Sequence, residues 1–154
     1  WIGNEDDRKI AQDRFWGHVG SRLANRYHLV PTLMMEKHLD VINMVKDLRR
    51  PILSLERDEI LWRFNDPNLG HCKLRFGNFL EINIESLDEI GPFLRPNEQT
   101  ITQFGVNSQD IFERLAAFGH VVDRIVPVGE ALSIGMDWDG KQSLSLLSRQ
   151  VEIR

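Results

Sequence analysis

Cysteine is almost absent from this chain, which contains only Cys72 among its 154 residues. A single cysteine excludes an intramolecular disulfide framework and favours a reducing, cytoplasmic location. Long apolar runs are also absent, since none approaches the roughly 20 residues that a membrane-spanning helix needs. With no signal peptide, internal repeat or low-complexity tract, the composition is that of an ordinary soluble globular protein.

Positive charge is scarce as well. The chain has 19 lysines and arginines against 23 acidic residues, which gives a formal net charge of -4. This acidic balance leaves no electrostatic footprint for nucleic acid or for an anionic membrane surface. We therefore expect neither of them as a partner.

A self-sufficient catalytic constellation is the third absence. The histidines show no metal-ligand spacing, and no phosphate-cradling Gly-x-Gly-x-x-Gly occurs. Cys72 follows His71 without a glycine-rich elbow, so we interpret it as a structural cysteine. The run Glu36-Lys37-His38 is typical of a solvated helix face. We assign no catalytic residue and no metal ligand within the chain.

What the chain does contain is a clear pattern between Leu74 and Leu94. A Phe76-Gly77 turn leads into a strand in which apolar and polar residues alternate. One face of this strand carries the apolar residues Leu80, Ile82 and Ile84, and the other face carries Glu81 and Asn83. Ser86 followed by Glu89 forms a capping box and predicts a helix. The turn is where we first look for chemistry.

Spacing and capping residues predict the remaining elements. Helices are expected at 4–27, capped by Asn4, at 31–48, at 107–118 and at 144–151. Strands are expected at 59–64, 100–104 and 122–128. This order predicts a single α/β domain over residues 1–154, with a largely parallel or mixed sheet flanked by helices.

Two further residue types call for a structural interpretation. Met34, Met35 and Met44 lie at helical spacing and are expected to fill the core. Asp137 and Asp139 lack the further oxygen ligands of a calcium loop, so a turn closed by Gly140 is the better interpretation.

The turn, strand and capping box together resemble the aldehyde dehydrogenase superfamily. In that superfamily a Glu-x-Phe-Gly-Pro turn contacts the nicotinamide cofactor ahead of a strand and a helix that starts with Asp-Glu. The corresponding residues here are Phe76-Gly77 and Asp88-Glu89. The resemblance implies that this chain is part of an aldehyde dehydrogenase-like catalytic domain.

A closer resemblance is to the acyl-CoA reductase family of bacterial bioluminescence and its non-luminous relatives. The run Asp123-Arg124-Ile125-Val126-Pro127-Val128-Gly129, with the later Trp138-Asp139-Gly140, is its most specific part. Two other places carry it: Leu61-Trp62-Arg63 leading to Arg75-Phe76-Gly77-Asn78, and Gln99-Thr100 before a strand. These places cover nearly the whole chain.

The resemblance implies an NADPH-dependent reductase that converts a fatty acyl thioester into an aldehyde through an acyl-cysteine. It assigns Phe76 and Gly77 to the cofactor side, and Asp139 and Gly140 to a loop that shapes the site. Leu74 replaces the superfamily glutamate that holds the nicotinamide ribose, and Asn78 replaces its proline. This interpretation is compatible with two protein partners, an acyl-protein synthetase and a second copy of the chain.

The start at Trp1-Ile2-Gly3, which is typical of the end of a strand, suggests a part of a longer protein. By resemblance, the catalytic cysteine and the nucleotide-binding domain lie upstream of Trp1. The alternative is a non-enzymatic binding or assembly module that retains part of a dehydrogenase fold. A glycine-rich nucleotide-binding region and a cysteine ahead of Trp1 would favour the enzyme.

Residues 1–154 alone are expected to have no reductase activity, because the resemblance puts the acyl-accepting cysteine outside them. The assay combines the isolated segment with NADPH and a long-chain acyl-CoA and measures aldehyde formation. Aldehyde produced by the segment alone would refute this assignment of the nucleophile.

Overall fold

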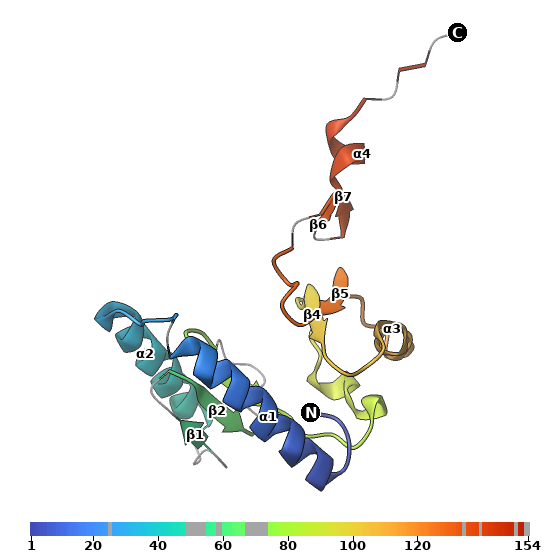
Figure 1. Cartoon of the computed structure of the whole chain (residues 1–154). Helices are drawn as coiled ribbons and strands as arrows, with labels where there is room; N and C mark the ends of the chain where they lie inside the picture. Colours follow the sequence, from blue (N-terminus) through green and yellow to red (C-terminus); the bar gives the residue numbers. More distant parts are fainter. Residues whose placement is uncertain are drawn as a thin grey trace. The chain divides into compact units, whose positions relative to one another are not determined.

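The computed structural model describes residues 1–24, 26–48, 55–57, 60–66, 74–133, 135–138, 140–149 and 151–152. The chain divides into two compact units, Trp1–Ser86 and Leu87–Arg154, and each is described by itself. Figure 1 shows their helices and strands. The combination of helices with short parallel sheets confirms the α/β class. The prediction of one domain over the whole chain stays a prediction.

Two helices open the first unit. α1 (Glu5–Leu23) is capped as predicted, since the Asn4 side chain accepts a 2.9 Å hydrogen bond from the Asp7 amide. The helix ends before the predicted Tyr27, and the Leu23 carbonyl at its end accepts hydrogen bonds from the amides of both Arg26 and Tyr27. α2 (Pro31–Leu48) begins and ends where it was predicted.

The sheet of the first unit is mixed. It has the order β1 (Leu55–Arg57), β2 (Trp62–Asn65) and β3 (Asn78–Glu81), with β1 antiparallel to β2 and β2 parallel to β3. Beyond β3, Ile84 forms a parallel bridge with Ile2, so the opening residues do run as a short extended segment.

One face of this sheet packs on α2 and is apolar. Trp62 and Phe64 of β2 form a buried cluster with Met44 of α2, and Leu80 of β3 packs against it. Phe64 is fully buried, with an exposed fraction of 0%. These residues alternate along their strands, so the strands direct their apolar side chains to α2.

The opposite face packs on α1 and is polar and aromatic. The Trp16 indole N–H donates to Glu81 at 2.5 Å, and its ring lies 5.0 Å from the Phe79 ring. The Arg63 guanidinium lies 5.4 Å from the Trp16 ring centroid. The predicted separation of Leu80 and Glu81 onto two faces is therefore confirmed, and helices cover both faces, as is usual for parallel pairs.

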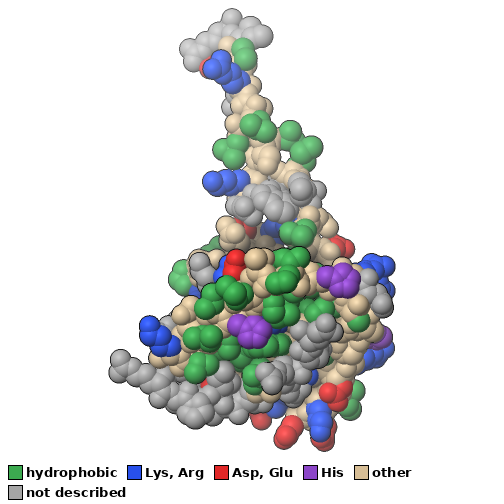
Figure 2. All heavy atoms as spheres, turned by 90° about the vertical axis from the view of Figure 1, so that its left-hand side faces the viewer, with side chains coloured by type: hydrophobic (Ala, Val, Ile, Leu, Met, Phe, Trp, Pro, Cys, Tyr) green, Lys and Arg blue, Asp and Glu red, His purple; other side chains and the backbone are tan. Residues whose placement is uncertain are grey.

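The outward side of α2 is also apolar. Met44 is 1% exposed, as a core methionine should be, but Met35 is 67% exposed and its prediction as a core filler was wrong. Leu39 and Ile42 share this exposed stripe. Figure 2 shows hydrophobic side chains gathered on the side of the molecule where α2 lies in Figure 1. Because α2 is apolar on two sides, helical spacing did not identify its buried side.

The second unit starts with two short 3-10 helices, η2 (Leu87–Glu89) and η3 (Gly91–Phe93). The helix that the capping box at Ser86 predicts is present only as the short 3-10 helix η2. A regular α-helix could not continue from η2 through Pro92, because proline has no amide hydrogen to donate to the carbonyl four residues earlier.

A β-α-β arrangement follows. β4 (Thr100–Gln103) pairs in parallel with β5 (Arg124–Pro127), and α3 (Ser108–Ala117) connects them. The Asn107 side chain caps α3 by accepting a 2.8 Å hydrogen bond from the Gln109 amide. Of the apolar residues of α3, Ile111 and Leu115 are buried, whereas Phe112 is 56% exposed.

The chain then forms a small hairpin, β6 (Asp137–Trp138) and β7 (Lys141–Gln142), and a short helix, α4 (Ser143–Leu147). Leu144 and Leu147 of α4 are exposed, and the helix ends before the predicted Val151. Among the described residues, no helix has both the length and the apolar character that crossing a membrane requires.

Leu115→Ala should lower the free energy of unfolding by about 2 to 5 kcal/mol, because it leaves a cavity beneath α3. Urea denaturation monitored by circular dichroism measures this loss. Leu132→Ala is the matched control in the same unit, since Leu132 is 85% exposed, and it should change stability by less than about 0.5 kcal/mol. Equal effects of the two substitutions would contradict the assigned core.

Candidate functional site

The Phe76-Gly77 turn spans residues 75–78 and leads directly into β3. The Asn78 amide donates to the Arg75 carbonyl at 3.1 Å. Phe76 and Gly77 have φ values of 56° and 83°, which is the pattern of a type I′ turn. Among the described residues, Phe76 is the only non-glycine residue with positive φ. Such strained residues concentrate at functional sites, so the turn is a candidate site on geometry as well.

Gly77 lies too close to the backbone ahead of β2 for any side chain. A Cβ atom built on Gly77 would lie 2.5 Å from the Ile60 carbonyl oxygen. The Gly77 carbonyl in turn accepts a 2.8 Å hydrogen bond from the Trp62 amide. The turn therefore packs directly against the start of the neighbouring strand.

Arg75 ties the outside of the turn to α2. Its guanidinium donates to both carboxylate oxygens of Asp40, at 2.8 and 2.9 Å, and to Glu36 at 3.3 Å. The hydrogen bonds that Arg75 donates to Asp40, with the charges of both carboxylates, raise the pKa of Arg75 above its ordinary value. The same guanidinium lies 4.9 Å from the Phe76 ring centroid. Arg75 is exposed, so this contact orients the turn more than it stabilises the fold.

Lys37 holds the turn from inside. Its side chain is 0% exposed. The ammonium group donates to the Phe76 carbonyl at 3.1 Å and to the Ile60 carbonyl, and it lies 5.0 Å from the Trp62 ring centroid. The prediction of a solvated Glu36-Lys37-His38 face was therefore wrong for Lys37. Lys37 lies on the same side of α2 as Val41 and Met44, which face the sheet.

The neighbours of Lys37 complete the surroundings of the turn. His38 is exposed, with Nδ1 at 2.7 Å from the Met34 carbonyl and its ring 4.9 Å from the Trp62 ring. Asn78 is buried, and its amide nitrogen donates to the Lys37 carbonyl at 3.4 Å. Leu74, which stands where the superfamily has glutamate, packs against the apolar cluster on α2.

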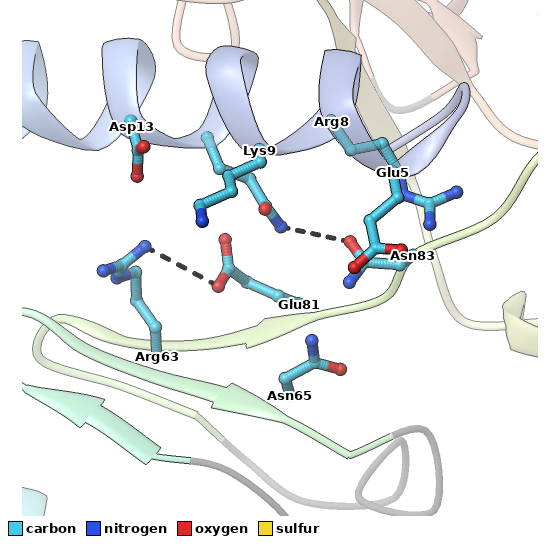
Figure 3. Close-up of a pocket in the computed structure, with 9 residues that line it drawn as sticks. Glu5, Arg8, Lys9, Asp13, Arg63, Asn65, Glu81 and Asn83 are labelled. Atoms are coloured by element: carbon cyan, nitrogen blue, oxygen red, sulfur yellow. Dashed lines mark hydrogen bonds and ion pairs between the residues drawn. The ribbon is translucent and has the colours of Figure 1, made fainter.

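A polar cavity of about 270 Å³ lies between α1 and the sheet, on the face opposite Lys37. Figure 3 shows side chains of α1 directed toward those of β2 and β3. Charges of both signs line it: Arg8, Lys9 and Arg63 against Glu5, Asp13 and Glu81. The residues that line it include no serine, cysteine or histidine. The cavity therefore suits water or a small polar molecule.

Glu81 is the central residue of that face, and the sequence did not predict its role. Its side chain is 8% exposed. One carboxylate oxygen accepts hydrogen bonds from the indoles of Trp1 and Trp16, at 2.7 and 2.5 Å, and the other lies 3.8 Å from Arg63. Alternation predicted only which face Glu81 occupies, because its partners come from residues far away in sequence.

In the second unit, the segments that carry the resemblance come together. A Cβ atom on Gly140 would lie 2.6 Å from the Asp123 carboxylate. The amides of Asp123 and Arg124 both donate to the Gln99 carbonyl, at 2.9 and 3.1 Å. The Arg124 guanidinium donates to the carbonyls of Ala131 and Ser133, at 3.1 and 3.0 Å. Arg124 thus anchors the loop that follows its own strand.

The predicted site residues have separate positions. Phe76 and Gly77 share one turn of the first unit, and Gly140 belongs to the second unit. Asp139 lies outside the described residues, as do His71 and Cys72. Lys37 and Asp40 were missed as neighbours of the turn, because nothing in their local sequence indicates a contact with residues 75 and 76.

Within the described ranges, no group of three or more histidine, cysteine, aspartate or glutamate side chains is arranged to hold a metal ion. No family model, curated protein or solved structure matches this chain. The candidate function therefore depends on the turn and on the resemblance of the motifs.

Gly77→Ala should destabilise the protein by roughly 1 to 3 kcal/mol or more, because alanine at this φ is strained and its Cβ meets the Ile60 carbonyl. Gly17→Ala is the control. Gly17 lies in α1 with nothing within 4 Å of its Cβ position, so alanine there should stabilise by up to about 1 kcal/mol. Urea denaturation compares both variants with the wild type. Stabilisation by both would contradict the geometry of the turn.

Proposed function

We propose that this chain is the C-terminal part of an NADPH-dependent fatty acyl-CoA reductase with an aldehyde dehydrogenase-like catalytic domain. The observation that carries the proposal is the Phe76-Gly77 turn. It combines the residues of the superfamily's cofactor turn with a positive φ at Phe76 and contacts to α2 on two sides.

The turn fits the role of a fixed aromatic surface. The Phe76 ring is half-buried, and the backbone beneath it is held by Lys37 and by the Arg75 pair with Asp40. A flat aromatic ring on a fixed support offers a packing surface to another flat ring, such as nicotinamide. Phe76 is therefore the residue that would contact the cofactor, and Gly77 permits the turn.

The second unit supports the proposal through its packing. Gln99, Asp123 and Gly140 belong to three separate segments of the resemblance, and they lie in contact. In the proposed enzyme Asp139 and Gly140 shape the site from this loop.

Leu74 gives the proposed reductase a different ribose environment from that of the superfamily. Because Leu74 packs against the cluster of Met44, Trp62 and Phe64, this position contributes to the core. The proposal therefore assigns no ribose contact to residue 74 and assigns the cofactor side to the turn of Phe76 and Gly77.

The reaction follows from the chemistry of thioesters. A cysteine thiolate N-terminal to this chain takes the acyl group from a fatty acyl thioester and releases the thiol. NADPH, when bound, supplies the hydride that converts the acyl-cysteine into the aldehyde and frees the thiolate. Phe76 would orient the nicotinamide ring and exclude water from one side of it. An acyl-protein synthetase remains the proposed protein partner, in the cytoplasm.

A second candidate is a non-enzymatic binding or assembly module, and the outer face of α2 favours it. Met35 and Ile42 are 67% and 59% exposed on one helix, and large exposed apolar patches mark interaction surfaces. The two candidates differ in one measurement. The full-length gene product forms aldehyde from acyl-CoA and NADPH if it is a reductase, and none if it is such a module.

Phe76→Ala in the full-length enzyme should slow hydride transfer by roughly two- to tenfold, because an aromatic contact to nicotinamide is lost. Acyl transfer to the cysteine should stay unchanged. Single-turnover experiments separate the two steps, with labelled acyl-CoA for the first and NADPH absorbance for the second. Phe104→Ala is the control, since Phe104 is 84% exposed. Equal loss of both steps, or loss of neither, would remove the turn from the mechanism.

A further inference from the structure

Lys37 is unusual because a lysine is almost never fully buried unless its charge is compensated. Its exposed fraction is 0%, on the side of α2 that otherwise carries Val41 and Met44 into the apolar cluster. Packing does not require a charge here, since methionine fills a similar volume without one. Packing therefore does not explain why a charged side chain occupies this position.

The hydrogen bonds of the ammonium group indicate a reason for the charge. It donates to the carbonyls of Ile60 and Phe76, which precede the parallel strands β2 and β3. Gly77, which follows Phe76, packs against the same Ile60 carbonyl. One charged group thus joins α2 to the starts of two neighbouring strands, through charge-assisted hydrogen bonds that are stronger than neutral ones.

The same contact bears on the strain at Phe76. A non-glycine residue with positive φ costs roughly 1 kcal/mol or more and persists only where its surroundings enforce it. The Phe76 carbonyl belongs to the peptide that follows this strained residue. A hydrogen bond from a buried ammonium group opposes rotation of that peptide, and so keeps the backbone under the Phe76 ring in one conformation.

We propose that Lys37 is a positioning residue: its buried ammonium group holds the Phe76 carbonyl and thereby fixes the Phe76 ring toward the cofactor. The holding of the turn follows from the contacts of Lys37, and the cofactor step rests on the proposed reductase function. Lys37 acts through Phe76 and does not take part in the chemical step.

The test uses Lys37→Met in the full-length gene product. Methionine keeps the length and apolar character of the side chain but cannot donate a hydrogen bond. Lys46→Met is the matched control, because Lys46 lies on the same helix and is exposed. Hydrogen exchange followed by mass spectrometry, without NADPH, reports on the amides of Trp62 and Asn78, which donate to Gly77 and Arg75.

Lys37→Met should speed exchange across the turn by about tenfold or more, the size expected when a hydrogen bond to a charged group is lost. It should also raise KM for NADPH while acyl transfer to the cysteine keeps its wild-type rate. Lys46→Met should change neither. Wild-type exchange in Lys37→Met would overturn the proposal, as would an equal loss of acyl transfer and hydride transfer.

The wild-type protein supplies a second measurement if Lys37→Met fails to fold. The amide of Asn78 should exchange slowly in the wild type, and exchange at the rate of an open loop would overturn the proposal. If the gene product reduces no acyl thioester, the reductase function fails and so does the cofactor role of Lys37. Faster exchange at the turn in Lys37→Met would then still show that the turn depends on this residue.

Discussion

A buried ammonium group is the constraint on which the first unit depends. Lys37 enters an apolar interface, so its charge must be met by oxygen atoms there, and it meets the carbonyls of Ile60 and Phe76. Removing a charge from water costs several kcal/mol unless such partners are in place. The helix, the entry to β2 and the turn before β3 must therefore form together, and the strained turn is stabilised by an interaction that tolerates little movement.

The two faces of the sheet are stabilised in different ways. On the α2 face, Trp62 and Phe64 are buried against Met44, and the contact is largely non-directional. On the α1 face, Glu81 and Arg63 are fixed by hydrogen bonds and ring contacts, which act only at defined distances. A candidate site at the start of β3 thus has a tightly packed layer on one side and a directional polar layer on the other.

Helix caps and turns could be predicted from the sequence, because they depend on neighbouring residues. The burial of a charged side chain against residues far away in sequence could not. Asn4 was identified as a helix cap because a cap depends on neighbours three residues or fewer away. The turn at Phe76 was found for the same reason. The burial of Lys37 was missed, because its partners lie 23 and 39 residues away. The helix predicted after Ser86 is present but only three residues long, because Pro92 lacks the amide hydrogen that a longer α-helix needs.

The carboxylate of Glu81, shared by two indoles, also limits how this protein can vary. Because Trp1 and Trp16 donate to the same oxygen atom, replacing Glu81 with an apolar residue would leave two N–H groups without their acceptor. Losing one tryptophan would instead leave the carboxylate less well compensated. Changes at these positions should therefore occur together among related sequences, and α1 and β3 should evolve as one unit although 65 residues separate Trp16 from Glu81.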